Sequence, residues 1–306
     1  MAPKTALGMT TLLTTDSVSQ AATADDFWVR GRDCDLFAIR RSDSLLVTFD
    51  NLASINERSE TRPWNPWLAS RAEMLGQSIL GVQSHHKDWY RSGEAPEQIR
   101  SLQQNGYFDR FRNIVFTGAS MGAFAALCFG SLVPRAKVLA FSPQSTLNRD
   151  IAPFEKRYPY PYRKFDWQEL EFLDASLYLD RISTGVIFFD PKVTEDKLHA
   201  KRLEAPRLSQ VQMPFTGHKL IRVIIKAGAL EHLLATYPET GKIDAQFFKL
   251  MRQRRDNERW AKPFLAAVTD RRDSRMTRRA CEIMHNIHGH RFARRMRRQM
   301  IARAKD

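Results

Sequence analysis

The pattern of hydrophobic and polar positions divides the chain into segments of different kinds. Short apolar runs of strand character lie at residues 27–30, 36–39 and 45–49, with turn residues between them, and they predict an antiparallel meander. From residue 66 on, segments with helical spacing alternate with short runs rich in β-branched and aromatic residues. This alternation predicts right-handed βαβ units, and therefore an α/β fold with a mainly parallel sheet and helices on both faces.

The alternating segments can be assigned one by one. We expect helices over residues 66–75, 96–104, 121–132, 197–203 and 219–235. We expect strands over residues 78–83, 113–117, 137–141, 185–189 and 208–213. The run Asn-Ile-Val-Phe-Thr at 113–117 is typical of a strand that is buried on both faces of a parallel sheet.

Three segments lie outside this alternation. Residues 1–25 are small and polar without periodicity and predict a flexible N-terminal arm, so the main α/β domain is expected to cover residues 26–245. Residues 143–182 interrupt that domain as an insertion without strand pattern, which either caps a pocket or packs its rings on the core. Its aromatic residues include Phe154, Tyr158, Tyr160, Tyr162, Phe165 and Trp167. Residues 246–306 predict a helical C-terminal extension.

Composition excludes several classes of protein. The chain has 306 residues, of which 43% are hydrophobic and 27% are charged. It is too apolar to be disordered and too charged to be a bundle of membrane-spanning helices. No run approaches the roughly 18 apolar residues that a membrane span needs, and the N-terminus has no apolar segment of a signal peptide. Cys34, Cys128 and Cys281 are widely spaced and odd in number, which argues against a disulfide framework. We therefore expect a cytoplasmic protein.

The positive charge is concentrated in the extension. The whole chain carries a net charge of +14, and residues 251–306 hold 17 Lys and Arg against 6 Asp and Glu, so the first 250 residues are nearly neutral. One face of the last predicted helix carries Arg291, Arg294, Arg295 and Arg298, and another carries Phe292, Met296 and Met300. Such a basic amphipathic helix either packs its apolar stripe on the main domain or binds an anionic membrane surface, an acidic polymer or nucleic acid. No recognised nucleic-acid module accompanies it.

A candidate nucleophile lies at Ser120, in Gly118-Ala119-Ser120-Met121-Gly122, which matches G-x-S-x-G. The motif follows the buried strand pattern at 113–117 and precedes an Ala-rich helical segment, which is the strand–turn–helix context that the motif requires. Only glycine fits two residues on either side of so tight a turn. The turn presents the serine hydroxyl at the start of a helix, where the Met121 amide can face an oxyanion.

On these residues the chain resembles the α/β-hydrolase superfamily over about residues 26–240. The specific part is Gly-Ala-Ser-Met-Gly-Ala-Phe-Ala-Ala-Leu at 118–127 with Val-Leu-Ala-Phe-Ser-Pro-Gln at 138–144, and it is similar to bacterial esterase-like members. The resemblance implies a Ser–His–Asp/Glu triad whose members follow in the order serine, acid, histidine. Of the eight histidines, His218 follows the last predicted strand, where the superfamily has its base.

The acid is open between three residues. Asp190 ends the strand at 185–189, and Glu195 and Asp196 follow in the next loop. The superfamily acid lies a few residues beyond the strand end, so we prefer Asp196, although Asp196 could instead cap the next helix and Asp190 could shape a turn with Pro191.

The resemblance also implies a second oxyanion donor in the loop after the third strand. The superfamily often has a Gly-rich loop there, whereas this chain has Phe-Asp-Asn-Leu at 49–52, so the amide of Asn51 or Leu52 is assigned. We therefore expect a serine hydrolase that acts on a small-molecule, carbohydrate or lipid ester or transfers its acyl group, with no cofactor and no metal. The alternative is a non-catalytic binding or assembly protein that keeps the scaffold and docks on an acidic partner through its basic extension.

Overall fold

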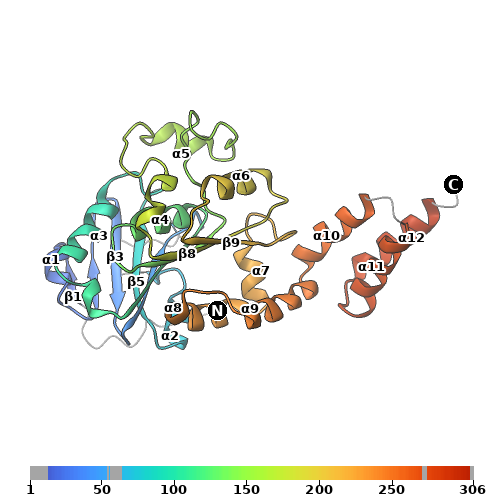
Figure 1. Ribbon diagram of the computed structural model, residues 1–306, viewed down its shortest axis with the longest axis horizontal. Helices are drawn as coiled ribbons and strands as arrows, with labels where there is room; N and C mark the ends of the chain where they lie inside the picture. Colours follow the sequence, from blue (N-terminus) through green and yellow to red (C-terminus); the bar gives the residue numbers. More distant parts are fainter. Residues whose placement is uncertain (1–12, 54, 56–63, 271–273, 304–306) are drawn as a thin grey trace.

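The computed structural model describes residues 13–53, 55, 64–270 and 274–303, and its centre is one β-sheet (Figure 1). The order of the strands in the sheet is β1-β2-β3-β5-β4-β6-β7-β8-β9, and every described strand except β3 runs in the same direction. The strands are β1 (Leu13–Thr15), β2 (Phe27–Val29), β3 (Cys34–Ile39), β4 (Ser44–Phe49), β5 (Ser78–Ser84), β6 (Asn113–Ala119), β7 (Lys137–Phe141), β8 (Thr184–Phe189) and β9 (Leu208–Gln212).

Helices cover both faces of the sheet and bury a separate hydrophobic cluster on each. One cluster includes side chains of α1 (Val18–Ala21), α3 (Glu94–Gln104), α4 (Met121–Gly130) and α6 (Thr194–Arg202). The other includes side chains of α2 (Ala69–Met74), α7 (Ile221–Lys226) and α8 (Ala229–Thr240). The predicted fold class, a mainly parallel sheet with helices on both faces, is confirmed.

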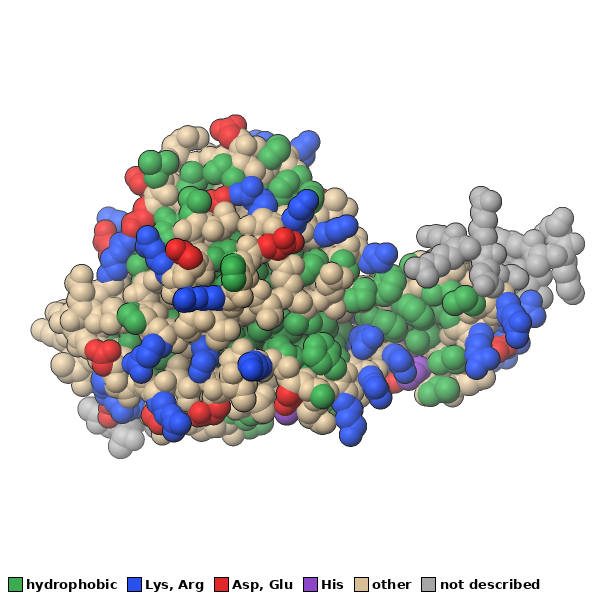
Figure 2. All heavy atoms as spheres, in the orientation of Figure 1, with side chains coloured by type: hydrophobic (Ala, Val, Ile, Leu, Met, Phe, Trp, Pro, Cys, Tyr) green, Lys and Arg blue, Asp and Glu red, His purple; other side chains and the backbone are tan. Residues whose placement is uncertain are grey.

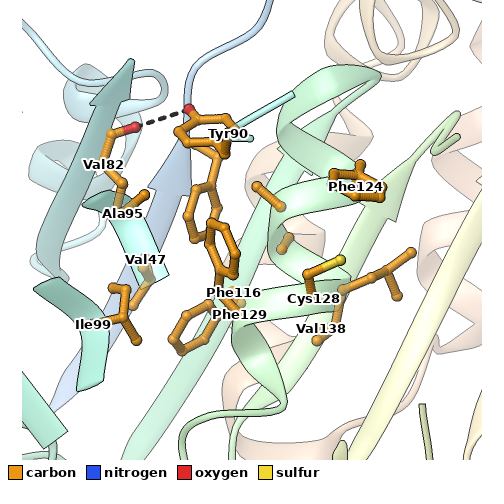
Figure 3. Close-up of a cluster of buried hydrophobic side chains, with 14 of the residues drawn as sticks. Val47, Val82, Tyr90, Ala95, Ile99, Phe116, Phe124, Cys128, Phe129 and Val138 are labelled. Atoms are coloured by element: carbon orange, nitrogen blue, oxygen red, sulfur yellow. Dashed lines mark hydrogen bonds between the residues drawn. The ribbon is translucent and has the colours of Figure 1, made fainter. Parts of the chain in front are cut away.

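Helix α4 is the element that holds the candidate serine in place. All ten of its residues are buried, which is the expected environment for a helix that is apolar all round. Phe129 of α4 packs against Phe49 of β4 with ring centroids 5.8 Å apart, and Phe49 in turn contacts Phe116 of β6. Phe116 and Phe129 lie in the same cluster of buried side chains (Figure 3). Burying each such ring contributes roughly 1.5–3 kcal/mol, so α4 is packed firmly on the sheet.

Two local predictions were wrong. The runs at 27–49 do not form one meander, because β5 lies between β3 and β4 and hydrogen-bonds to both. The chain leaves β4, passes through α2 and returns in β5, so strands that are neighbours in sequence are not neighbours in the sheet. The helix expected over 219–235 is broken into α7 and α8, since Gly228 adopts a left-handed conformation with φ of 65° that interrupts the helical hydrogen bonds.

The predicted N-terminal arm is partly structured. Residues 13–15 form β1, which pairs in parallel with β2, and Ala21 and Ala22 are buried in the core beside it. The prediction of a flexible arm is therefore wrong for residues 13–25, because a short edge strand and two buried alanines tie this segment to the sheet. Residues 1–12 lie outside the described part of the chain.

The insertion between β7 and β8 contains α5 (Pro159–Lys164) and the 3-10 helix η3 (Ala175–Arg181). It begins at the carboxyl end of β7, next to the carboxyl end of β6, where Ser120 follows. In Figure 1 the segment that carries α5 lies above the sheet, at the top of the view. The insertion is thus placed to contribute side chains to a site at this edge.

The C-terminal extension is helical, as predicted, and projects from the main body (Figure 1). It consists of α9 (Ala245–Leu250), η4 (Met251–Asp256), α10 (Glu258–Asp270), α11 (Ser274–Asn286) and α12 (Arg291–Arg303). Phe292 and Met296 of α12 pack on a buried cluster that includes Met284 of α11, while the side chain of Met300 lies outside the described residues. Hydrophobic side chains gather where the extension meets the body (Figure 2). None of the described helices is long and apolar enough to cross a membrane.

Candidate active site

Ser120 occupies a strained turn between β6 and α4. Its backbone has φ of 55° and ψ of −116°, a conformation that costs a non-glycine residue on the order of 1–3 kcal/mol. A Cβ atom on Gly118 would lie 2.2 Å from the carbonyl oxygen of Gly122, and one on Gly122 would lie 2.6 Å from that of Phe49. Both positions therefore require glycine, as the motif predicts, and the close approach at Gly122 brings the end of β4 against the start of α4.

The structure brings Ser120, His218 and Asp196 into one hydrogen-bonded chain. The hydroxyl oxygen of Ser120 lies 3.0 Å from Nε2 of His218, and Nδ1 of the same ring lies 2.9 Å from both carboxylate oxygens of Asp196. Asp196 is in the first turn of α6 and His218 in the loop after β9. With Nδ1–H donated to Asp196, Nε2 presents its lone pair to the Ser120 hydroxyl, which is the geometry for removing its proton.

The other two candidate acids have different surroundings. Asp190 is buried at the end of β8, where its carboxylate accepts hydrogen bonds from the backbone amides of Lys192 and Gly217. It thereby holds the loop that precedes His218, but among the described contacts neither Asp190 nor Glu195 reaches the His218 ring. Of the three carboxylates, Asp196 is the one in contact with the histidine.

Arg157 of the insertion is the second partner of Asp196. Its Nη1 donates to Oδ1 of Asp196 at 2.7 Å, and its Nη2 donates to Glu155 at 2.5 Å. Burial opposes the ionisation of Asp196, but the hydrogen bonds and positive charge of His218 and Arg157 outweigh it and lower the pKa of this carboxyl. Asp196 is therefore ionised at neutral pH, as an orienting acceptor for His218 must be.

A buried polar cluster continues from Arg157 away from the serine. His199 lies between Glu155, which is 3.0 Å from its Nε2, and Ser145, whose backbone amide donates to Nδ1 at 3.0 Å. Burial lowers the pKa of His199 even though Glu155 opposes this, so the ring is neutral and its Nε2–H donates to Glu155. Despite burial, hydrogen bonds from His199 and Arg157 lower the pKa of Glu155 to about 2.

Sequence reasoning missed two side chains that contact Ser120. The hydroxyl of Tyr158 lies 3.0 Å from Nε2 of His218 and 3.4 Å from the Ser120 hydroxyl. Oε1 of Gln144 lies 3.3 Å from the Ser120 hydroxyl and also accepts from Nε1 of Trp89 at 3.0 Å. The sequence marked Tyr158 only as one of the aromatic residues of the insertion, and nothing in its spacing from Ser120 indicates the contact.

Two residues are assigned to the oxyanion hole, Met121 next to Ser120 and Asn51 in the loop after β4. Met121 is the first residue of α4, so its amide belongs to the helix N-terminus, whose partial positive charge favours an anion. Asn51 lines the same cavity as Ser120, and its side chain accepts from the amide of Ala53 at 2.9 Å, which stabilises the loop after β4. The role of Met121 and Asn51 as oxyanion donors stays a prediction.

Two cavities open beside the serine. One of about 420 Å³ contains Ser120 and His218, with Trp67 and Phe141 in its apolar wall. The other, of about 600 Å³, is lined largely by the insertion and the loop after β5, and it shares Leu52 and Tyr158 with the first. Among the described residues, no group of His, Cys, Asp and Glu side chains has the arrangement to hold a metal ion.

Comparison with known proteins gives fold-level likenesses only. No protein-family model and no curated protein matches the chain. A capsule O-acetyltransferase of Neisseria meningitidis serogroup A is 10% identical, with a TM-score of 0.46 over 68% of this chain and 93% of that chain. Est1E from Butyrivibrio proteoclasticus is 11% identical, with a TM-score of 0.41 over 69% of this chain and 99% of that chain. An arylesterase structure is 11% identical, with a TM-score of 0.44 over 71% of this chain and 89% of that chain. Likenesses this weak carry no conclusion about chemistry.

Proposed function

We propose that this protein is a serine hydrolase that cleaves an ester, or transfers its acyl group, through an acyl-enzyme on Ser120. One observation carries the proposal: a strained serine at the start of a buried helix is hydrogen-bonded to a histidine, which is hydrogen-bonded to an ionised carboxylate. This chain of contacts opens into a cavity of about 420 Å³, where an acyl group can reach the serine.

The first step is attack on the ester. The Ser120 oxygen adds to the carbonyl carbon while its proton passes to Nε2 of His218, and Asp196 stabilises the resulting imidazolium. The negative charge that develops on the carbonyl oxygen is placed at the N-terminus of α4, where the Met121 amide donates and the loop at Asn51 provides the second donor.

In the second step the carbon–oxygen bond to the alcohol breaks, and the alcohol oxygen takes the proton from Nε2 of His218. The acyl group remains on Ser120 as an ester. Water, or an acceptor alcohol in a transfer reaction, then gives its proton to His218 and attacks the acyl carbon. The bond between that carbon and the Ser120 oxygen breaks, and the oxygen takes the proton back from Nε2 of His218, which restores Ser120. These steps use groups of the protein and the substrates alone and need no cofactor.

Labelling with a fluorophosphonate probe tests the proposal without knowledge of the substrate, because the probe reacts with serines that are activated by a base. We expect the wild-type protein to be labelled and the Ser120→Ala variant to remain unlabelled. Ser131→Ala, which removes a hydroxyl at the other end of α4, is the matched control and should label like the wild type. A folded wild-type protein that does not react would favour the binding-protein alternative.

We also propose that the extension docks on an anionic membrane surface or acidic polymer. The support is charge: Arg291, Arg294, Arg295 and Arg298 are all exposed on α12, while Phe292 packs inward. Replacing the four arginines by glutamine should therefore leave the fold intact and weaken salt-sensitive binding to vesicles of anionic lipid or to polyphosphate. Undiminished binding would show that α12 is not the docking element.

A further inference from the structure

Two hydroxyl groups compete for one nitrogen at the candidate site. Nε2 of His218 lies 3.0 Å from the hydroxyl of Ser120 and 3.0 Å from that of Tyr158. A neutral imidazole whose Nδ1–H is donated to Asp196 has a single lone pair on Nε2, so only one of these hydroxyls can donate to it in good geometry. The second hydroxyl must serve another purpose.

The position of Tyr158 is set by its surroundings. Its ring packs on that of Trp89 with centroids 4.7 Å apart. The guanidinium carbon of Arg157 lies 5.4 Å from the centroid of the Tyr158 ring, and Arg157 is itself hydrogen-bonded to Asp196. Trp89 is fully buried and hydrogen-bonded to Gln144. Burial raises the pKa of the Tyr158 hydroxyl, so it remains protonated and able to donate at neutral pH.

The side of the serine on which Tyr158 lies limits what it can do. In the tetrahedral intermediate the oxyanion faces the helix N-terminus, whereas the leaving oxygen must face Nε2 of His218 to receive its proton. The Tyr158 hydroxyl is in contact with Nε2 and lies 3.4 Å from the Ser120 oxygen, so it lies in the corner where the leaving oxygen departs.

We propose that Tyr158 is a further catalytic residue, which donates a hydrogen bond to the oxygen of the leaving alcohol. The assignment rests on the proposed function. As the intermediate collapses, the carbon–oxygen bond breaks and its electron pair moves to the alcohol oxygen. That oxygen takes the proton from Nε2 of His218, while Tyr158 stabilises the developing charge and keeps its own proton.

This role also resolves the competition at Nε2. Before substrate binds, the lone pair of Nε2 can accept from either hydroxyl, and the Ser120 hydroxyl also lies 3.3 Å from Oε1 of Gln144. When an ester binds, its alcohol oxygen accepts the hydrogen bond of Tyr158, and the lone pair of Nε2 becomes available to Ser120.

Tyr158→Phe tests the assignment, because it removes the hydroxyl and keeps the ring on Trp89. The quantity to measure is kcat/KM, which reports the steps up to departure of the alcohol. For an alkyl ester such as ethyl butyrate, whose alkoxide leaves poorly, we expect a loss of about 10- to 100-fold, as for a hydrogen bond to a charged group. For p-nitrophenyl butyrate, whose leaving group needs no proton, the loss should be less than about threefold.

Tyr162→Phe removes a hydroxyl from the same insertion and should leave both rates unchanged, since the Tyr162 ring contacts Arg149 and lies outside both cavities. Labelling of the Tyr158→Phe variant by a fluorophosphonate, whose fluoride also leaves without a proton, should match the wild type and show that Ser120 and His218 are intact. An equal loss on both esters, or no loss on either, would overturn the role of Tyr158 while turnover by the wild type upholds the proposed function. A wild type that turns over neither ester overturns both.

Discussion

The molecule contains two assemblies of histidine, carboxylate and serine that share residue types but differ in accessibility and ring orientation. In one, Asp196 lies on Nδ1 of His218 and Ser120 on Nε2, and the histidine side chain is 23% exposed. In the other, Glu155 lies on Nε2 of His199 and Ser145 on Nδ1, and the histidine is fully buried. Both histidines therefore have a carboxylate on one nitrogen and a serine on the other.

The two assemblies differ in the group of the serine that donates a hydrogen bond to the histidine. The Ser145 backbone amide donates to Nδ1 of His199, and the Ser145 hydroxyl lies 3.0 Å from the same nitrogen and accepts from Arg202, so this fully buried ring has satisfied partners. In contrast, it is the hydroxyl of Ser120 that contacts Nε2 of His218, and both side chains line a cavity. A list of residue types cannot separate a structural histidine from a catalytic one, whereas access and the identity of the donor can.

The largest expected effect is the contrast in activity between the two histidines. His218→Ala should lower kcat/KM for p-nitrophenyl butyrate by at least about 10³-fold, because members of such a unit lose most of the rate enhancement singly. Its melting temperature should change little, since the side chain is partly exposed. A His218→Ala variant with more than a tenth of the wild-type activity would remove the basis of the comparison.

The next effect separates the candidate acids. Asp196→Asn should lower activity by roughly 10³- to 10⁴-fold, because an amide favours the wrong tautomer of His218. Asp190→Asn should be milder, since Asp190 acts on the loop through the amides of Lys192 and Gly217. Steady-state kinetics on both folded variants checks the ranking, and a reversed order would make Asp190 the acid.

The buried assembly should respond in stability instead. His199→Ala leaves the Glu155 carboxylate without its histidine in a closed environment, and we expect a loss of about 3 kcal/mol in the free energy of unfolding. Urea denaturation monitored by fluorescence measures it. Activity per folded molecule should fall much less than in His218→Ala, and a loss of activity without a loss of stability would contradict the structural role.

Arg157 joins the two assemblies, and its removal should sharpen the distinction. Arg157→Gln takes a positive charge from Asp196, so the Asp196–His218 pair should bind a proton more readily. The acid limb of the pH–kcat/KM profile should therefore move to higher pH, by up to about one unit. Arg149→Gln, a change at another arginine next to the insertion's aromatic residues, is the control and should leave the profile in place.

The smallest effect concerns the pH dependence of stability. His199 has a lowered pKa when folded, so below its ordinary value of 6.5 the unfolded chain takes up a proton that the folded protein does not, and stability falls with pH. Glu155, with its pKa lowered to about 2, adds a second loss as pH falls below its ordinary 4.5. Melting temperatures from pH 8 to 4 should show the first loss in the wild type and not in a His199→Phe variant.

Sequence patterns predicted what depends on neighbours along the chain. The run at 113–117 and the glycines around Ser120 predicted strand, turn and helix, because burial on both faces and a tight turn each restrict the residues allowed locally. The crossing of β5 between β3 and β4 was not predictable, since strand order depends on packing over long separations. The sequence shows a glycine at position 228, but it does not show that this glycine adopts a left-handed conformation and ends the helix.

The same limit applies to the candidate site. Ser120, His218 and Asp196 were named from motif and order, and the structure brings these three together. Asp196 and Asp190 differ only in which groups they face, so the sequence left both open. Tyr158 lies 38 residues from Ser120 and 60 from His218, and the contact exists only because the insertion folds back over the sheet edge.

The short stretch from Glu155 to Tyr158 has a consequence for divergence. Its side chains contact His199, Asp196 and the Ser120–His218 pair, so a substitution in this stretch changes the surroundings of residues on α6 and in the loop after β9. A substitution of Glu155 would remove the carboxylate that both His199 and Arg157 contact. Such a substitution would be tolerated only with compensating changes at positions 157 and 199. Among homologues that keep Asp196, positions 155, 157 and 199 should therefore covary as one set, whereas exposed positions of the same insertion, such as Leu170, should drift independently.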